Sequence, residues 1–520
     1  MEPKGDSINH IIVKEIAGEQ VSITESRAIP VDEFTGYYGA GDVLKPIYNP
    51  EQLIRLSETS DILQQCIEAY KTNIVGFGYN VNYDEDYDKL DGSAKTEADL
   101  MWNRYQRFFQ YCNFDESFIE IMKKMLDDRE KIGYGCLEVI EDGTGKPAGL
   151  EHVQAHKVRL CPKDKTFIDV PMTVLDEYDK PVTITIRKRF RRFVQIVNEK
   201  RVYFKEFGDP RLLDYRTGEF SDDVAPECRA SSMIFFNIYC PYSEYGLPRY
   251  MGQLLNLMGN RKAEELNYRY FLNGRHIPLA VVVENGKLTP ESIENLEKST
   301  GNVAQHKFLL LEAEGLEKDV SLAEDNAKSV VKIRLEKLVE IMEKDGLFQE
   351  YCNNNRSKIR SAYRLHPIYT GESQDYTRAT ADTARQVTEE QVFQPEREDL
   401  QFKLNNILKP ALEITGVSLE FKSPKLSNKL ELAQALTPYI TGGAATPNML
   451  IDALGDLLGK SFDAFEEPWA NLPIILAMQE YQQQNANPGT GAAENAEEIT
   501  EVVGALKSLQ KSIQEATDYD

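Results

Sequence analysis

The stretch YSEYGLPRYMGQLLNLMGNRKAEELNYRYFLNG, residues 242–274, marks a change in the chain from strand-like to helical patterns. Gly246 permits a sharp turn and Pro248 suits a first helical turn, so we expect a helix over 248–274. At 1.5 Å per residue it would be about 40 Å long. The stretch contains no paired carboxylates, no nucleophile beside a base and no metal-ligand spacing. It therefore indicates a structural element rather than a catalytic one.

The composition restricts the function classes. The 520 residues carry 60 Lys and Arg against 84 Asp and Glu, a formal charge of −24, which argues against coating DNA or an anionic membrane. The longest apolar runs fall far short of the ~20 residues of a membrane helix, and the start lacks a secretory pattern. Seven cysteines without a CxxC pair predict free thiols in a reducing cytoplasm.

Upstream of this stretch, the pattern predicts an α+β domain over 49–247, preceded by a polar arm over 1–48. Asn49-Pro50 begins a helix that Gly76 ends, and a second helix runs from about Asp115 to Gly133. From there to Asn237 we expect a mostly antiparallel sheet. Its expected elements are a hairpin around EDGTGKP and strands over 182–186, 193–197 and 201–207.

Downstream, a small β unit lies between predicted long helices. We expect a strand over 277–283, a helix over 290–299 and a strand over 307–311, then a helix over 324–362 with Val331, Leu335, Leu338 and Met342 on one face. An interruption over 363–377 precedes a helix over 378–414. A strand over 417–421, helices over 428–440, 447–459 and 469–482, a polar linker and a coiled-coil-like seam over 499–513 complete the prediction.

Four segments carry a resemblance to a known family. They are IGYGCLEVI at 132–140, FGDPRLLDYRTGEF at 207–220, YSEYGLPRY at 242–250 and RYFLNGRHIPLAVVV at 269–283. Because the four segments occur in this order, the chain resembles the portal proteins of tailed bacteriophages and prophages, in the HK97-like group and close to its PBSX-type branch. The resemblance covers about residues 49–485.

The resemblance implies an α+β portal fold, assembled as a ring of twelve subunits. The wing would be 49–247, the first stem helix 248–274, the clip 275–322, the second stem helix 323–362 and the tunnel loop 363–377. Residues 378–424 would return to the wing, 425–485 would form the crown, and 486–520 would be a linker and C-terminal helix.

The resemblance also implies where function lies. The ring would nucleate capsid assembly at a virion vertex, pass double-stranded DNA, and contact terminase, head–tail adaptors, and capsid and scaffolding proteins. It implies no catalytic residue, cofactor, metal or membrane. The implied tunnel-loop residues are His366, Tyr369, Thr370, Glu372, Gln374, Tyr376 and Arg378. The implied channel-lining or inter-subunit stem residues are Arg249, Arg261, Lys262, Arg269, Lys328, Lys332 and Lys337, and the implied clip docking residues are Glu284, Asn285 and Lys287.

Other interpretations stay open at the level of sequence. A nucleic-acid-processing enzyme of the cytoplasm would need carboxylates such as Asp84–Asp86 or Asp127-Asp128, although the second pair is expected on a solvent face. A head–tail adaptor is a third class, but adaptors are generally shorter. Gly143–Lys146 fits a hairpin turn better than a phosphate loop, because Ile140 and Pro147 break the P-loop spacing. The basic run 187–192 fits a solvated or subunit-bridging sheet face, and the His152/His156 pair lacks the Glu of a zinc protease.

Overall fold

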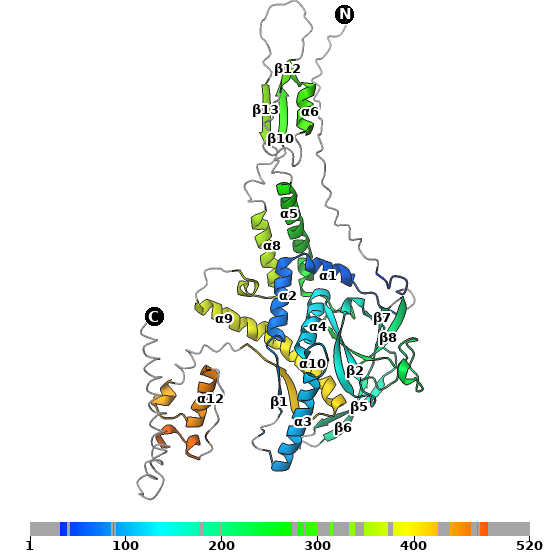
Figure 1. The fold of residues 1–520 in the computed structure, drawn as a ribbon, viewed down its shortest axis with the longest axis vertical. Helices are drawn as coiled ribbons and strands as arrows, with labels where there is room; N and C mark the ends of the chain where they lie inside the picture. Colours follow the sequence, from blue (N-terminus) through cyan, green and yellow to red (C-terminus); the bar gives the residue numbers. More distant parts are fainter. Residues whose placement is uncertain are drawn as a thin grey trace, which may run out of the picture. The chain divides into compact units, whose positions relative to one another are not determined.

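The computed structural model describes residues 32–38, 42–84, 87, 90–175, 181–197, 199–272, 279–284, 286–298, 312–315, 332–337, 348–372, 378–424, 437–458, 465 and 468–476. The chain divides into two compact units, Met1–Pro424 and Lys425–Asp520. The larger unit is a mixed α+β structure (Figure 1).

The larger unit contains a six-stranded sheet. Its order is β3-β2-β9-β8-β7-β4, and all neighbouring strands are antiparallel except β8 and β9. The strands are β2 (Tyr134–Glu141), β3 (Pro147–Val153), β4 (Arg159–Leu160), β7 (Arg192–Val197), β8 (Lys200–Glu206) and β9 (Ser232–Asn237). The predicted mostly antiparallel sheet, its EDGTGKP hairpin and the strands over 193–197 and 201–207 are confirmed, whereas the strand expected over 182–186 lies in a separate two-stranded sheet.

The N-terminal helical part is more divided than predicted. Asn49 caps a helix as expected, but the chain breaks at Thr59-Ser60, where the Ser60 side chain caps a new helix. The expected single helix from Asn49 to Gly76 is therefore wrong in its continuity, because Ser60 supplies a cap in its middle. The helices are α1 (Pro50–Glu58), α2 (Asp61–Ile74), the unpredicted α3 (Gly92–Gln110) and α4 (Phe118–Ile132).

Local signals determine both ends of α4. The Ser117 hydroxyl accepts from the Glu120 amide while the Glu120 carboxylate accepts from the Ser117 amide, a capping box. At the other end, Gly133 adopts the left-handed conformation, with φ of 92°. The predicted helix ending at Gly133 is confirmed.

A segment distant along the chain packs with α2 and α4 in one hydrophobic core. The expected strand over 417–421 is β14 (Val417–Phe421), which pairs antiparallel with β1 (Tyr79–Tyr83). The helical stretch before it consists of α9 (Arg378–Thr388), a π-helical turn (Glu389–Phe393) and α10 (Gln394–Leu412). Leu400, Leu404 and Leu408 of α10 are buried in the same core as α2 and α4. The predicted helix over 378–414 is thus confirmed, with a π turn inside it.

The opening stretch forms a shorter α-helix than predicted. After Pro248 comes a 3-10 helix (Arg249–Gln253), and only then α5 (Leu254–Leu272), which lies beside α8 (Gln349–Ala362) (Figure 1). The continuous helix expected over 324–362 is wrong, because residues 332–337 are the strand β13 (Lys332–Lys337). Its apolar residues alternate with charged ones, so that Ile333 and Leu335 pair with valines of β10 (Leu279–Glu284).

The remaining elements are short. They comprise the hairpin β5 (Ile168–Leu175) and β6 (Pro181–Lys188), the pair β11 (Gly286–Leu288) and β12 (Ala313–Gly315), and the 3-10 turns Ala155–Lys157, Pro226–Cys228 and Pro367–Thr370. The helices expected over 290–299 and 447–459 are confirmed as α6 (Pro290–Lys298) and α12 (Pro447–Leu458).

Several expected segments lie wholly or largely outside the described residues. These are the strand over 307–311, most of the arm, the linker and the terminal seam. Of the helices expected over 428–440 and 469–482, the structure describes helix at 437–441, a 3-10 turn (Pro468–Asn471) and helix at 474–476. All seven cysteines are free thiols, as predicted.

Candidate functional site

The turn that opens the helical region is held by a backbone contact that only glycine permits. A Cβ at Gly246 would lie 1.8 Å from the carbonyl oxygen of Gly133, and one at Gly133 would lie 2.6 Å from the carbonyl carbon of Gly246. The Tyr245 hydroxyl donates to the Leu44 carbonyl at 2.7 Å and accepts from the Leu160 amide at 2.8 Å. The end of α4 and the start of the helical region are therefore packed backbone to backbone.

Four charges lie next to this contact, two of them buried and two largely covered, and we call Arg129, Glu130, Arg249 and Glu396 the junction cluster. Arg129 Nη2 donates to Glu130 at 2.8 Å and to Glu396 at 2.7 Å. Arg249 donates through Nε to Glu130 at 3.0 Å and through Nη2 to Glu396 at 2.5 Å. Two cations and two carboxylates thus alternate, and the Glu130 side chain is fully buried.

Burial and charge act in opposite directions on these groups. For Arg249, burial by itself lowers the pKa, but Glu130 and its neighbours more than offset it, so the pKa is raised. For Glu396, burial by itself raises the pKa, but Arg129 and Arg249 outweigh it, so the pKa is lowered. Opposite charges thus favour the charged forms of Arg129, Arg249 and Glu396, and the cluster is an electrostatic link between α4, α10 and the 3-10 turn that begins the helical region.

This placement corrects one predicted site residue. Arg249 was expected to line a channel or bridge to a neighbouring subunit, but its guanidinium lies within its own chain, 5.2 Å from the ring centre of Tyr70. The sequence carries a signal for the cluster, because Arg129 falls on the stripe of α4 that Phe118, Met122 and Met125 also occupy. Glu396 comes from 267 residues further along the chain, and no local pattern connects it to Arg129.

The other predicted stem bases do not share one place. Arg261 and Lys262 are exposed on α5, and Lys262 pairs with Glu265 at 2.7 Å. Arg269 also belongs to α5, although its side chain lies outside the described part. Lys332 and Lys337 lie on strand β13 rather than on a stem helix, which corrects their expected placement, and Lys328 lies outside the described residues.

The close approach of α5 to α8 depends on a second glycine. A Cβ at Gly259 would lie 2.2 Å from the Tyr351 hydroxyl oxygen. Leu257 and Ala263 of α5 are buried, whereas Leu255 and Met258 are exposed. One face of α5 is therefore packed within the chain and another is not.

The expected tunnel loop turns inward over its first part. Tyr369 makes an edge-to-face contact with Phe393, with ring centres 5.4 Å apart, and Thr370 is buried. Arg360 Nη1 donates to Glu372 at 2.5 Å, which ties the loop to α8. His366 is half-buried at the start of the 3-10 turn. Gln374 and Tyr376 lie outside the described residues, and Arg378 begins α9.

The expected clip residues lie on the small strands. Glu284 ends β10, opposite Lys332 of β13, and Lys287 is in β11, opposite Glu314 of β12. Asn285 lies outside the described residues. Glu284 and Lys287 therefore lie on two consecutive strands, at the end of β10 and within β11.

Three carboxylates of the enzyme hypothesis have partners inside the chain, and residues 85–86 lie outside the described residues. Asp84 pairs with Lys409 at 2.9 Å, and Asp127 pairs with Lys71 at 3.1 Å. Asp128 accepts from the Ala155 amide at 2.9 Å and contacts His152 Nε2 at the same distance. The solvent face expected for Asp127 and Asp128 is wrong, because both side chains are largely covered by these contacts.

The described residues contain no group of three or more His, Cys, Asp or Glu side chains placed to hold a metal ion. Among them, too, no helix is long and apolar enough to cross a membrane.

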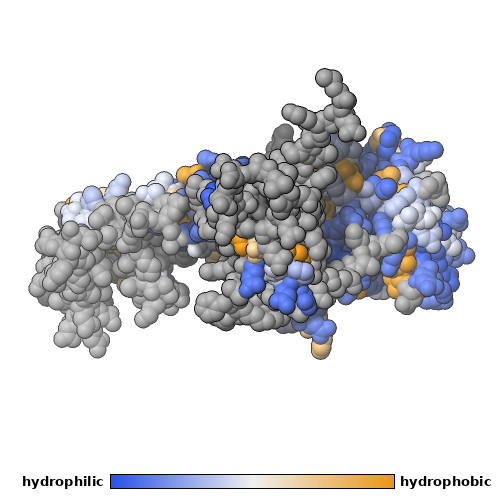
Figure 2. Space-filling model, turned by 90° about the horizontal axis from the view of Figure 1, so that it is seen from above, coloured by the Kyte–Doolittle hydropathy of each residue, from blue (hydrophilic) through white to orange (hydrophobic). Residues whose placement is uncertain are grey.

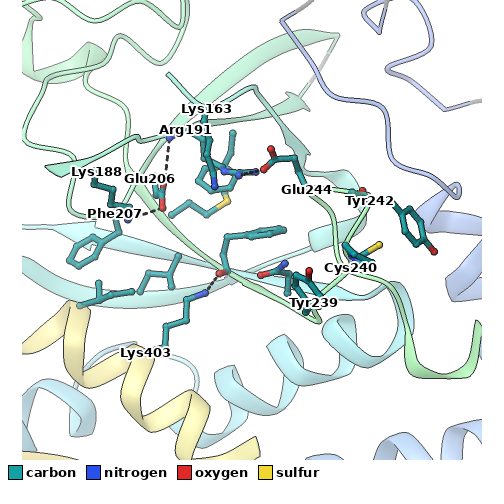
Figure 3. Close-up of a pocket in the computed structure, with 18 residues that line it drawn as sticks. Lys163, Lys188, Arg191, Glu206, Phe207, Tyr239, Cys240, Tyr242, Glu244 and Lys403 are labelled. Carbon is teal, nitrogen blue, oxygen red and sulfur yellow. Dashed lines mark hydrogen bonds and ion pairs between the residues drawn. The ribbon is translucent and has the colours of Figure 1, made fainter. Parts of the chain in front are cut away.

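A cavity of about 590 Å³ lies between the sheet and α10 (Figure 3). Its charged lining residues are Lys163, Lys188, Arg191, Glu206, Glu244 and Lys403. Lys188 pairs with Glu206 at 2.9 Å, and Arg191 Nη2 donates to Glu244. Part of the basic run 187–192 therefore faces this cavity, which the sequence analysis did not predict.

Comparisons with known proteins give two related sequences of similar length. No protein-family model matches the chain. It is 45% identical over 458 residues to the uncharacterized protein YqbA of Bacillus subtilis (strain 168), covering 87% of this chain and 89% of YqbA. It is 44% identical over 453 residues to the phage-like element PBSX protein XkdE of the same organism, covering 85% of this chain and 90% of XkdE.

Similar solved structures are more distant. A chain from the neck of an empty GTA particle is 14% identical with a TM-score of 0.49, covering 81% of this chain and 97% of that one. An HK97 family phage portal protein from Corynebacterium diphtheriae is 10% identical with a TM-score of 0.37, covering 74% and 96%. Family membership accordingly depends on the two sequence relatives.

Proposed function

The chain belongs to the family of the Bacillus subtilis proteins YqbA and XkdE, and on this premise we propose that it is the portal subunit of a phage-like element. The observation that carries the proposal is the 44% identity to XkdE, a protein of phage-like element PBSX, over 85% of this chain. This relationship confirms the resemblance to PBSX-type chains. The role would be structural: a homo-oligomeric ring, of twelve subunits in the virion, around a passage for double-stranded DNA.

The uncovered face of α5 supports association into a ring. Leu255, Met258 and Leu266 are 82%, 52% and 45% exposed, and they follow one another at helical spacing. Elsewhere, the described surface seen in Figure 2 is mainly hydrophilic, with small separate hydrophobic areas. In a ring each subunit contributes two different surfaces, so the uncovered side of α5 would pack on a neighbouring copy.

The finer roles follow from the same proposal. The unit built from β10, α6 and β13, with Glu284 and Lys287, would dock the terminase large subunit during packaging and head–tail adaptors afterwards. Because Tyr369 and Thr370 are held inside the chain, contact with DNA would fall to residues 373–377. Replacing 373–377 by Gly and Ser should leave rings intact and impair DNA packaging or retention, whereas unchanged packaging would contradict this assignment.

Ring formation is the direct test of the proposal. Light scattering and negative-stain microscopy of the purified chain should show rings with a central hole. Leu255→Glu should abolish them, because a charge would replace an apolar contact, while Leu100→Glu at an exposed position of α3 serves as the matched control. A stable monomer with nuclease or NTPase activity would overturn the proposal in favour of an enzyme.

A further inference from the structure

The cavity beside α10 is built from three separate parts of the larger unit. Phe193 and Met233 come from the sheet, Lys403 comes from α10, and residues 239–244 come from the segment just before the Gly246 turn (Figure 3). A ligand here would contact the sheet, the returning helix and the lead-in to α5 together.

The charge of the cavity is opposite in sign to that of the chain. Four cations and two carboxylates line it, whereas the whole chain carries −24. The carboxylates Glu206 and Glu244 are engaged by Lys188 and Arg191. Within the part of the chain that the structure describes, no carboxylate forms an ion pair with Lys163 or Lys403. The cavity therefore has positive charge that no described carboxylate neutralises by an ion pair.

Arg191 contributes a buried donor that has no acceptor. The residue is only 7% exposed, and its Nη2 is used by Glu244. Its Nη1 is buried and finds no hydrogen-bond partner among the described residues. Buried donors are nearly always paired, and the planar guanidinium fork matches the oxygens of a carboxylate or phosphate. Arg191, which lines the cavity, therefore has a hydrogen-bond donor that the described residues do not use.

Lys403 provides a second, independent observation. Its ammonium donates to the Phe235 carbonyl and lies 4.8 Å from the ring centre of Phe236. Burial lowers the pKa of Lys403 to about 8, although Glu206 opposes the shift. A negative ligand would offset this loss of hydration, because an opposite charge nearby favours the protonated amine.

We propose that this cavity is an oxyanion-binding site that holds a carboxylate or phosphate group through Arg191, Lys403 and Lys163. The same chemistry has two sources: a small free anion, or an acidic side chain of a second copy of this chain. The second source rests on the proposed ring, whereas the first does not. In either case the bound group would tie the sheet and α10 to the segment that begins the helical region.

Titration calorimetry with citrate and with inorganic phosphate, at constant ionic strength, tests the free-anion source. Arg191→Gln should weaken binding about tenfold or more, as for loss of a charged hydrogen bond. Lys163→Gln should weaken it about two- to fivefold, as for an exposed charge. Lys165→Gln, the same change at an exposed lysine outside the cavity lining, should leave affinity unchanged.

Arg191→Gln also breaks the pair with Glu244, so its fold is checked by circular dichroism. If that variant does not fold, Lys163→Gln and Lys403→Met decide the result. Binding of either anion that none of the cavity substitutions weakens would place it elsewhere and overturn the site.

Zero-length cross-linking of amines to carboxylates tests the second source. Mixed ¹⁴N and ¹⁵N protein should yield cross-links from Lys163 or Lys403 that join one isotope to the other, and citrate should suppress them. Such cross-links without free-anion binding would assign the site to a neighbouring copy. The absence of both anion binding and inter-copy cross-links would refute the proposal. Rings are scored separately by light scattering, so their absence beside intact anion binding would refute only the portal role.

Discussion

Replacing Arg249 by Met should loosen the junction between α4, α10 and the start of the helical region. The substitution keeps a long side chain but removes the two ion pairs to Glu130, at 3.0 Å, and Glu396, at 2.5 Å. It leaves two carboxylates facing the single cation Arg129. Because the Glu130 side chain is fully buried, water cannot take the place of the missing guanidinium.

The size of the effect follows from this burial. Removing one partner of a buried ion pair costs about 3–5 kcal/mol, much more than an exposed pair contributes. At 1.4 kcal/mol per factor of ten, the local opening equilibrium should rise by roughly two to three and a half powers of ten. The 5.2 Å stacking of Arg249 on Tyr70 places the result toward the upper end of this range.

Hydrogen exchange read by mass spectrometry on peptides over 118–132 and 394–412 measures this opening in the full chain. Lys262→Met is the control, because Lys262 is 79% exposed and its pair with Glu265 is worth well under about 1 kcal/mol. The double variant Arg249→Met with Glu130→Gln removes one charge of each sign, so its cost should be clearly smaller than the sum of the two single costs. A loss of protection below about tenfold in Arg249→Met, or additive costs in the double variant, would refute the reasoning.

Three further outcomes are expected. Gly246→Ala should lower the free energy of unfolding by about 3 kcal/mol or more, because the new Cβ would lie 1.8 Å from a backbone oxygen, and calorimetry should show this as a lower unfolding temperature. Gly252→Ala is the control, because its Cβ would meet nothing within 4 Å, and it should leave the unfolding temperature unchanged. Gly259→Ala should lower the free energy of unfolding by less, roughly 1–2 kcal/mol. Adding Tyr351→Phe to this variant should restore most of that stability, because the 2.2 Å contact is with the Tyr351 hydroxyl. If stability does not return, this contact is not the cause of the loss. The pKa of Glu396 is lowered in the folded chain, because the arginines of the junction cluster outweigh burial. Its stabilisation is therefore present above about pH 4.5 and lost as the pH falls through the folded value, and Glu396→Gln should flatten the acid limb of unfolding temperature against pH.

Elements with strong local signals were predictable. The cap at Asn49, the end at Gly133 and the strand over 417–421 all have bounds that residues within one turn or one strand determine. The strand over 332–337 was mistaken for helix, because the apolar spacing of 331, 335, 338 and 342 also fits a helical face. Strand pairing with the valines of β10 decides between the two, and that partner is about 50 residues away in sequence.

The candidate sites show the same division. The sequence identifies basic residues but not their partners. Arg249 therefore fits the pattern of a surface cation, and no local pattern identifies Lys403 as a site residue. Their environments come from α4, α10 and the sheet, which are distant along the chain. Burial then changes the meaning of a charge: an exposed arginine is available to a partner, whereas Arg129 and Arg249 of the junction cluster already have their counter-ions within the chain.

By itself, the sequence determined the class of this protein, its family resemblance and the ends of its well-capped helices, because these depend on composition, on ordered motifs and on residues near one another. Only the tertiary structure decided which glycines must stay glycine, which charges are internal and where the cavity lies. These depend on how closely distant backbones approach, as at Gly133 and Gly246. Such distances are set by the packing of the whole unit, and no local pattern encodes them.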